Sequence, residues 1–322
     1  MIISPPKIGV VILNFNSARD TLSCLESLRR APGGERRTWV VDNASTDGSA
    51  DVLRPALRDD EVWLPTGANL GYAGGNNAGI LEALRWGAAY VLVLNPDLTV
   101  EADFLPPMVR ALEAVPKAGV ACSLTLDMDT GKVQSLGGDF SLWTGRARRR
   151  FYQSEPGQTG IGRWSAVDFP LGDCMLFKRS FLEEVGLLND AYFLYYEDVE
   201  IGMRARREGW TVLAIPHSRV HHRDTTESRA GDPVVSFYGT RNQAWVVSQY
   251  GNFLQRLCYL FLSCYLRWPW RFLARLLRGN FRAAFAVVRG GWAGQTSKAW
   301  AAVGDHLALP LEGRPLRVEP LP

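Results

Sequence analysis

Residues 8–17 read Ile8-Gly9-Val10-Val11-Ile12-Leu13-Asn14-Phe15-Asn16-Ser17. The run from Ile8 to Leu13 is continuously apolar, which is typical of a strand buried on both faces in a parallel sheet. Ser17 can cap the N-terminus of a helix, and three leucines then follow at helical spacing, so a helix is predicted to extend to about Arg30. The start of the chain therefore predicts one buried strand followed by one helix.

The same alternation of strand and helix continues to about residue 97. Further strands are predicted at residues 38–41, 62–64 and 90–94, with a helix ending at Leu57 and another at about 76–86. Such alternation is typical of an α/β domain with a mainly parallel sheet, in which ligands bind beyond the carboxyl ends of the strands. Polar residues stand at three of these ends: Asn14, Asp42 and Asp97.

These polar residues allow a binding interpretation and a purely local one. Asp42 can accept hydrogen bonds from a nucleobase or ribose, or it can form an Asx-turn or a helix cap. Asp97 follows Asn95 and Pro96, where one carboxylate can hold a divalent ion that bridges a diphosphate, or the segment can form a type I turn. Gly71–Gly75 resembles a phosphate-cradling loop, but it lacks the spacing of the known glycine-rich motifs.

The stretch 171–222 carries a group of acids in an apolar setting. It begins with a strand-like run at 171–177, and an aromatic run then leads to Glu197, Asp198 and Glu200 at the start of a predicted helix. An apolar setting raises the pKa of a carboxyl group and suits a general base, which favours a catalytic role for the first two. Acids at a helix N-terminus also complement the helix dipole, and this alternative stays open for Glu200 above all.

Composition describes a folded chain with ample core. The 322 residues are 47% hydrophobic and 21% charged, and they can form one large domain or a core domain with an appendage. The five cysteines form no CxxC pair, which favours a reduced, cytoplasmic setting, and no signal peptide is predicted at the N-terminus. Three histidines at 217, 221 and 222 lack the accompanying ligands of a structural zinc site.

Charge is divided unevenly along the chain. Residues 241–322 carry eleven Lys or Arg against three acids, whereas the remainder carries 25 basic and 30 acidic residues. The longest charge-free run in the aromatic segment 253–270 has ten residues, and a bilayer span needs about 20. An amphipathic element in the membrane interface is therefore predicted, with a packed helical subdomain or a dimer surface as the alternatives. In this prediction five arginines lie at the headgroups and two tryptophans act as anchors: Arg256, Arg267, Arg271, Arg275, Arg278, Trp268 and Trp270.

Residues 127–165 are irregular and include the basic run Arg146–Arg150. A mobile loop or a β-excursion near the site is predicted for this segment, with an ordinary solvated loop as the alternative for the arginines.

The motifs also resemble a known family when they are taken in order. The segments 11–16, 40–49, 69–79 and 94–97, together with the Glu197-Asp198 pair, resemble the family-2 inverting glycosyltransferases of GT-A fold. The resemblance covers roughly residues 7–225 and points to the bacterial branch that includes rhamnosyl- and galactofuranosyltransferases of cell-envelope polysaccharides. It implies a GT-A catalytic domain at 1–230 and leaves 231–322 as a basic, aromatic-rich helical region.

Residue roles follow from this resemblance. Asp198 corresponds to the catalytic base, Asp97 to the metal-binding aspartate and His222 to the histidine that serves the metal or the diphosphate. Asp42 corresponds to the acid that holds the donor base, and Asn14, Asn69 and Asn95 are further donor-binding candidates. Asp173 and Glu197 are candidates for orienting the acceptor. Because many relatives have two or three carboxylates in the metal motif, the Asn95-Pro96-Asp97 version is expected to bind metal less tightly.

The resemblance implies transfer of a rhamnose-like or other hexose, with inversion, from a dTDP-, UDP- or GDP-linked donor. The expected acceptor is a hydroxyl of a cell-envelope glycan or a polyprenyl-linked acceptor, and the expected cofactor is Mg²⁺ or Mn²⁺. We expect action at the cytoplasmic face of the cell membrane and no nucleic-acid partner, and homodimer formation stays open. The alternative is a non-catalytic glycan- or membrane-binding protein on the same fold. A dinucleotide oxidoreductase is excluded because GxGxxG is missing after the first strand.

Overall fold

The computed structural model describes residues 6–32, 34–223 and 231–296. The strands are β1 (Ile8–Asn14), β2 (Arg36–Asp42), β3 (Glu61–Pro65), β4 (Tyr90–Leu94), β5 (Leu98–Val100), β6 (Ala118–Asp127), β7 (Val133–Ser135), β8 (Gly138–Ser141), β9 (Arg146–Arg149), β10 (Ser165–Val167), β11 (Cys174–Lys178) and β12 (Thr211–His222). The α-helices are α1 (Ala18–Arg30), α2 (Ser49–Leu53), α3 (Gly71–Arg85), α4 (Leu105–Ala114), α5 (Arg179–Val185), α6 (Glu197–Arg207), α8 (Pro233–Tyr250), α9 (Phe253–Leu262), α10 (Trp268–Leu277) and α11 (Phe281–Thr296).

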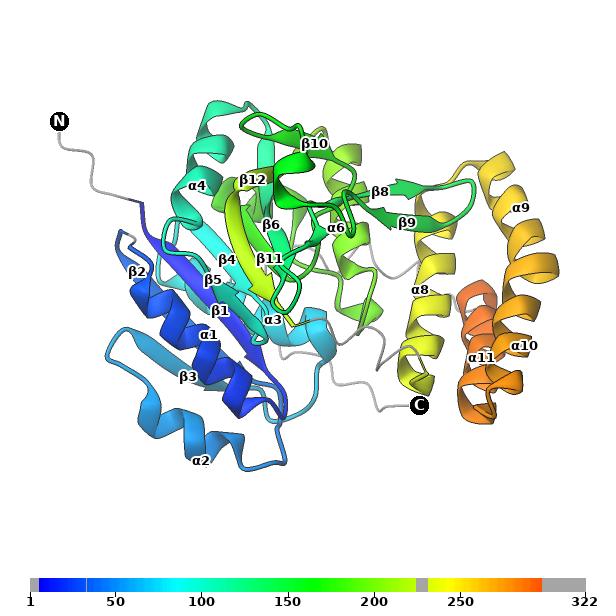
Figure 1. Ribbon diagram of the computed structural model, residues 1–322, viewed down its shortest axis with the longest axis horizontal. Coiled ribbons are helices and arrows are strands. Elements are labelled where there is room, and N and C mark those ends of the chain that lie inside the picture. The colour runs from blue at the N-terminus through cyan, green and yellow to red at the C-terminus, as the bar shows by residue number, and fades with distance from the viewer. Residues whose placement is uncertain (1–5, 33, 224–230, 297–322) are drawn as a thin grey trace.

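One curved sheet forms the centre of the molecule (Figure 1), with the strand order β10-β12-β6-β11-β4-β1-β2-β3. The half formed by β4, β1, β2 and β3 is parallel throughout, as the alternation of strands and helices predicts. β11 is antiparallel to both of its neighbours, and β12 runs parallel to β6. Asn14 and Asp42 are register partners at the ends of β1 and β2, so these two polar side chains meet at one edge of the sheet.

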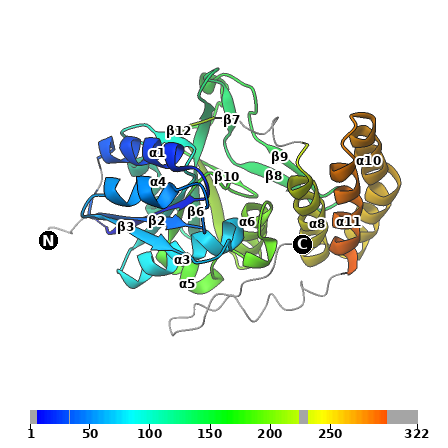
Figure 2. The ribbon, with the colours of Figure 1, turned by 90° about the horizontal axis from the view of Figure 1, so that it is seen from below.

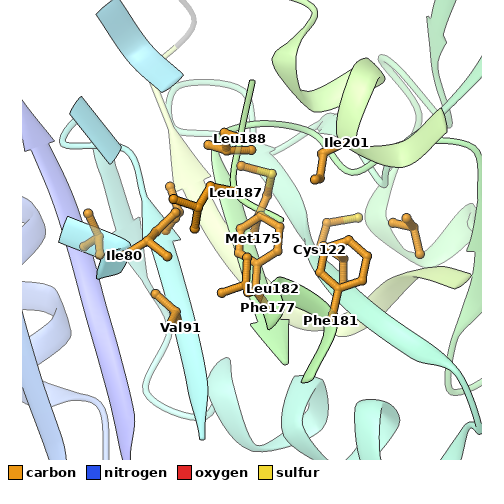
Figure 3. Packing of buried hydrophobic residues seen from close by; sticks show 14 of the residues in the cluster. Ile80, Val91, Cys122, Met175, Phe177, Phe181, Leu182, Leu187, Leu188 and Ile201 are labelled. Atoms are coloured by element: carbon orange, nitrogen blue, oxygen red, sulfur yellow. The ribbon is translucent and has the colours of Figure 1, made fainter. Parts of the chain in front are cut away.

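Helices cover both faces of the sheet, and each face has its own apolar core. Val11 and Leu13 of β1 pack on the side of α3, α5 and α6, whereas Val10 and Ile12 pack on the side of α1 and α4. This division explains why the first strand is apolar at successive positions. Figure 3 shows the core beneath α3 and α5, where Met175 and Phe177 of β11 lie among residues from both helices.

Helix α3 begins five residues before the predicted start at Asn76. Gly71–Gly75, which resemble a phosphate-cradling loop in sequence, form the first turn of this helix and continue into the second. Their glycines serve close packing: a Cβ at Gly75 would collide with Leu13, and one at Gly79 with Val11. The absence of side chains at these positions brings α3 directly onto β1.

The segment 127–165 is a β-excursion, one of the two structures predicted for it. β7 pairs with β6, and β8 and β9 form a separate antiparallel hairpin. The first four residues of the run Arg146–Arg150 form β9, and Arg150, which follows the strand, is tied to Asp139 by a salt bridge.

The C-terminal helices lie beside the sheet, as both views show (Figures 1 and 2). Helix α8 shares an apolar cluster with the segments around α6, in which Trp245 and Val246 pack with Tyr192 and Val199. Helices α9, α10 and α11 lie outside α8. The predicted boundary at residue 230 and the basic residue Lys298 fall outside the described residues.

Among the described residues no helix is long and apolar enough to cross a membrane. Three residues of the interfacial prediction contact other parts of the protein. Arg267 donates to the carbonyl of Thr144 and Arg275 to the hydroxyl of Ser236, so both guanidinium groups are turned toward the protein. The ring of Trp268 packs against Gly291 of α11, so part of this side chain faces the protein. Trp270, in contrast, is 70% exposed, as predicted.

Candidate active site

The loop that leads into α6 has an unusual backbone. Phe193, Tyr195 and Tyr196 have φ angles of 59°, 66° and 69°, in the left-handed region that residues with a side chain rarely adopt. Each such residue costs on the order of 1–3 kcal/mol and persists only where the surrounding structure holds it. This backbone turns the chain so that Glu197 and Asp198 enter the site from the first turn of the helix.

Asn242 of α8 holds this loop. Its side-chain amide donates to the carbonyl oxygens of Tyr192, Leu194 and Tyr195 at 2.8, 2.9 and 2.7 Å. The neighbouring Arg241 donates to the carbonyls of Ala191 and Tyr192. Neither residue is a site candidate from sequence, because nothing in the helical pattern of α8 singles out a buried asparagine.

Asp198 is partly buried, and both of its carboxylate oxygens accept backbone hydrogen bonds. Oδ1 accepts from the N–H of Val199 at 2.7 Å and Oδ2 from the N–H of Gly172 at 3.2 Å. Burial raises the pKa of Asp198 to about 6, and these two hydrogen bonds oppose the rise. A carboxylate with a pKa near 6 is mostly ionised at neutral pH and is a stronger base than an exposed aspartate.

Glu197 is 5% exposed, and its Oε2 accepts no hydrogen bond from the residues that the structure describes. Burial, and then the charge of Asp198, raise the pKa of Glu197 to about 8. At neutral pH Glu197 is therefore mostly protonated beside an ionised Asp198. Glu200 has a different role: it is fully buried and bonds to Arg204 at 2.9 Å and to Tyr250 at 2.6 Å, so it is structural.

Tyr72 of α3 lies at the centre of the site. Its hydroxyl donates to the carbonyl of Gly172, and its pKa is raised well above the usual value by burial and then by four surrounding acids. We call these acids the carboxylate cluster: Asp97, Asp173, Glu197 and Asp198. The structure therefore brings together four acids that are site candidates from sequence. They surround a tyrosine that is not a candidate from sequence.

Asp173 is the member of the carboxylate cluster that contacts β6 and the loop after β4. Its Oδ2 accepts from the hydroxyl of Thr125 at 2.7 Å, and its backbone carbonyl accepts from the N–H of Asn95 at 2.8 Å. Burial raises the pKa of Asp173, whereas the nearby His222 lowers it. Asp173 is thus a hydrogen-bonded part of the wall between Asn95 and the loop that leads into α6.

His222 faces Asp97, with 3.2 Å between Nε2 and Oδ2. On the other side of the ring, Nδ1 lies 2.7 Å from Oε1 of Gln134. The amide nitrogen of Gln134 donates to Asp127 and to the His222 carbonyl, so its Oε1 must accept, and Nδ1 of His222 must carry a proton. This arrangement directs Nε2 toward Asp97 and leaves it available as a ligand when the ring is neutral. Gln134 lies in the irregular segment and is not predicted from sequence.

The other candidates form the strand-end cluster: Asn14, Asp42, Asn43, Ser45 and Asn69. The side-chain amide of Asn14 donates to Asp42 Oδ1 and to the Ser45 hydroxyl, each at 3.0 Å. Asn43 donates to Asn69 at 3.0 Å and accepts from the backbone of Leu70 at 2.9 Å. The Asx-turn expected as the alternative for Asp42 accounts for only one weak contact, from the Ser45 N–H at 3.4 Å.

We tested whether the carboxylate cluster fits a divalent ion. No group of three or more His, Cys, Asp or Glu suited to a metal occurs within residues 6–32, 34–223 and 231–296. The Asp97–His222 pair nevertheless offers one carboxylate and one imidazole pointing at each other. Magnesium commonly takes only one or two carboxylates from the protein and the remainder from substrate phosphates and water. The pair therefore fits an ion whose other ligands come from a diphosphate.

Solved structures identify the fold as that of the GT-A glycosyltransferases. One similar structure is that of GalNAc-T7 with UDP, GalNAc and Mn²⁺. The alignment covers 95% of this chain and 58% of the GalNAc-T7 chain, with a TM-score of 0.65 and 13% sequence identity. Another is the mannosyltransferase PcManGT of Pyrobaculum calidifontis in complex with GDP-Man and Mn²⁺. That alignment covers 97% of this chain and 84% of the PcManGT chain, with a TM-score of 0.56 and 16% sequence identity. The fold expected from sequence is thereby confirmed.

Residues 9–186 match the model of glycosyl transferase family 2, and the chain belongs to this family. It is 28% identical over 218 residues to a low-salt glycan biosynthesis hexosyltransferase of Haloferax volcanii. The aligned residues make up 62% of this chain and 62% of the hexosyltransferase. It is also 29% identical over 249 residues to an N-acetylglucosaminyl-diphospho-decaprenol L-rhamnosyltransferase of Mycobacterium tuberculosis. The aligned residues make up 68% of this chain and 77% of the rhamnosyltransferase. The chain thus spans less than two thirds of the length of the hexosyltransferase.

Proposed function

We propose that this glycosyltransferase moves a rhamnose-like or other hexose from a nucleoside-diphosphate donor to a hydroxyl of a lipid-diphosphate-linked glycan, with inversion. The observation that carries the proposal is the geometry of the pair: Glu197 is buried, whereas Asp198 is partly exposed and accepts the N–H groups of Val199 and Gly172. The rhamnosyltransferase relative, whose name specifies a diphospho-decaprenol acceptor, supports the acceptor class.

In this mechanism Asp198 takes the proton of the acceptor hydroxyl as its oxygen attacks the anomeric carbon. The bond between that carbon and the diphosphate oxygen breaks on the opposite face, which inverts the configuration. Neutral Glu197 adds no second negative charge beside Asp198 and can donate a hydrogen bond to the acceptor. Asp173 is proposed to orient the same sugar from the opposite wall.

Asp97 and His222 would hold a divalent ion, which supplies positive charge to the leaving diphosphate when it is bound. Gln134 keeps the His222 ring in the orientation that this role needs. At the other end, Asp42 and Asn14 are proposed to bind the nucleoside, with Asn69 and Asn95 nearby on the loops that follow β3 and β4.

We also propose that the enzyme works at the cytoplasmic face of the membrane, where a lipid-linked acceptor resides. Helices α9, α10 and α11 support this proposal through a set of exposed large apolar side chains, which we call the apolar face. It includes Phe253, Leu257, Phe261, Tyr265, Trp270, Leu277, Phe285 and Trp292. An exposed apolar set of this size marks an interaction site with a membrane or a protein.

The experiment is transfer from dTDP-, UDP- and GDP-linked sugars to a short-chain N-acetylglucosaminyl-diphospho-lipid, with Mg²⁺ or Mn²⁺ and with EDTA. We expect transfer from one donor class, loss of transfer with EDTA and a product of inverted anomeric configuration by NMR. Absence of both transfer and donor binding across the panel would contradict the proposal, and a product of retained configuration would contradict the mechanism.

A further inference from the structure

Strand β9 carries three arginines among its four residues. Arg146, Arg148 and Arg149 form no salt bridge with any residue that the structure describes, whereas the adjacent Arg150 is paired with Asp139. Together with Phe151 and Tyr152 they line a cavity of about 510 Å³. Three like charges on one short strand repel each other, so a bound anion would stabilise this arrangement. We call these three residues the arginine strand.

One end of the arginine strand reaches the carboxylate cluster. Burial raises the pKa of both Asp173 and Asp198, and the positive charge of Arg149 opposes the rise at each of them. Arg149 is also the register partner of Gly138 at the base of the hairpin, close to the central sheet. Gly138 in turn donates to the carbonyl of Phe169, three residues before the Gly172 that bonds to Asp198, so the base of the hairpin lies near the proposed acceptor position.

The other end of the arginine strand reaches the C-terminal helices. The hairpin turn is fixed by Arg267, which donates to the Thr144 carbonyl, and by Gln243, which donates to the Gly145 carbonyl at 2.6 Å. Figure 1 shows the β8–β9 hairpin extending from the sheet to α9. The charges of the strand thus lie between Asp198 and the apolar face.

The order of these three features matches the order of groups in one kind of molecule. From the carboxylate cluster outward, the protein presents Asp198, then the arginine strand, then the apolar face of the C-terminal helices. A lipid-linked sugar presents a hydroxyl, then a diphosphate, then a hydrocarbon chain. Arg146 and Arg148 point to the same face of β9 and lie about 7 Å apart, so their guanidinium groups can contact neighbouring phosphates, whereas Arg149 points to the other face at the end nearest the sheet. Guanidinium groups bind phosphate oxygens through paired N–H donors.

We infer that the arginine strand is the subsite for the diphosphate of the acceptor, distinct from the position of the donor diphosphate at Asp97 and His222. This inference rests on the proposed function, because it specifies how that acceptor is held. It means that the arginine strand binds the acceptor through its diphosphate, apart from the residues proposed to contact the acceptor sugar.

The test compares two acceptors that carry the same sugar, one on a short-chain lipid diphosphate and one on a neutral octyl glycoside. The variant is R146Q/R148Q/R149Q, and the matched control is R163Q, which removes an exposed arginine outside the cavity. We expect the triple variant to raise the KM for the diphosphate acceptor by about 30-fold or more, since each charge-assisted hydrogen bond contributes substantially. The KM for the octyl glycoside and for the donor should stay within about twofold.

Three results would overturn the inference: unchanged KM values for both acceptors, a selective rise in the KM of the donor, or an equal rise for both acceptors. Loss of vesicle binding with unchanged KM in detergent would assign the arginines to lipid headgroups instead. A thermal melt of the triple variant checks folding, and the exposed position of β9 predicts a wild-type melting temperature.

A binding measurement separates this inference from the proposed function. Geranyl diphosphate is titrated into the wild type and the triple variant in the presence of EDTA. Heat of binding that depends on the three arginines supports the subsite even if no donor in the panel is transferred. Equal binding by both proteins, or none by either, would contradict it.

Discussion

The carboxylate cluster and the strand-end cluster are held in place by different kinds of contact. Asn14 and Asp42 bond to each other at the ends of two adjacent parallel strands, and no left-handed backbone is needed at either residue. Asp198, in contrast, follows a strained loop that is held by Asn242 from a distant helix. The comparison teaches that sheet geometry alone places Asn14 and Asp42, whereas the position of Asp198, the proposed base, depends on the C-terminal region. Changes at the two clusters should therefore have separable effects.

The largest effect is expected from Asp198→Asn. The amide keeps the shape of the side chain but cannot take the acceptor proton, so kcat should fall by about 10²- to 10⁴-fold. The change is measured by steady-state transfer, with Asp103→Asn at an exposed acid as the control. Near-wild-type turnover would move the base to Glu197 or Asp173.

The next largest effect is expected from Asn242→Leu, which removes three hydrogen bonds to the strained loop without a large change in volume. A misplacement of the base by about 1 Å can cost about 10²-fold, so we expect kcat to fall by roughly 10- to 100-fold while the donor Kd is unchanged. Asn252→Ala is the control, because it removes the cap of α9 and costs about 1 kcal/mol without touching the loop. An equal loss of kcat in both variants would assign the effect to general stability.

A smaller effect concerns stability and pH. The pKa of Glu197 is raised from 4.5 to about 8, so across that range the native state holds a proton that the unfolded state has released. This contribution of Glu197 therefore makes the fold less stable as pH rises through the window. Glu197→Gln removes it, and the melting temperature at pH 9 should exceed that of the wild type by about 2–4 °C.

At pH 4 the two proteins should melt at similar temperatures, because Glu197 is then protonated in both states of the wild type. Asp103→Asn serves again as the neutral control. A constant difference between Glu197→Gln and the wild type from pH 4 to pH 9 would show that the Glu197 carboxyl is not perturbed.

The smallest effect is expected for membrane association. The exposed cations of the C-terminal helices are Arg256, Arg278, Arg282 and Arg289. Each contributes about 1 kcal/mol near an anionic leaflet, so changing all four to Gln should weaken sedimentation with anionic liposomes, as should high salt. Transfer to a short soluble acceptor should survive, since the carboxylate cluster is untouched. Liposome binding that ignores both changes would favour a dimer surface, which sedimentation velocity would detect.

Sequence alone predicts the parts of the site that sheet order determines. Asn14, Asp42 and Asp97 follow apolar runs, and the carboxyl ends of parallel strands meet at one edge, so their convergence needs no knowledge of distant contacts. Asp198 is predicted from the apolar run before it together with the family resemblance. Its raised pKa follows from the burial that such a run implies.

The remainder depends on contacts between segments that are far apart in the chain. Asn242, Gln134 and Tyr72 act on loops that no local pattern connects to them. The glycines of α3 are interpreted correctly only once β1 is seen beneath them. Arg267 and Trp268 lie on a helix whose inward face is set by the β8–β9 hairpin and by α11, so composition could not assign them to protein or membrane.

The most direct test of the contrast between donor binding and base catalysis is the nucleotide-sugar Kd, measured by titration calorimetry with Mg²⁺ for Asp97→Ala and Asp198→Asn. We predict that Asp97→Ala weakens donor binding by about tenfold or more and removes its dependence on the metal, because Asp97 would hold the ion that supplies positive charge to the diphosphate. Asp198→Asn should bind the donor with the affinity of the wild type. Unchanged affinity in Asp97→Ala, or a comparable loss in Asp198→Asn, would contradict the division of roles between Asp97 and Asp198.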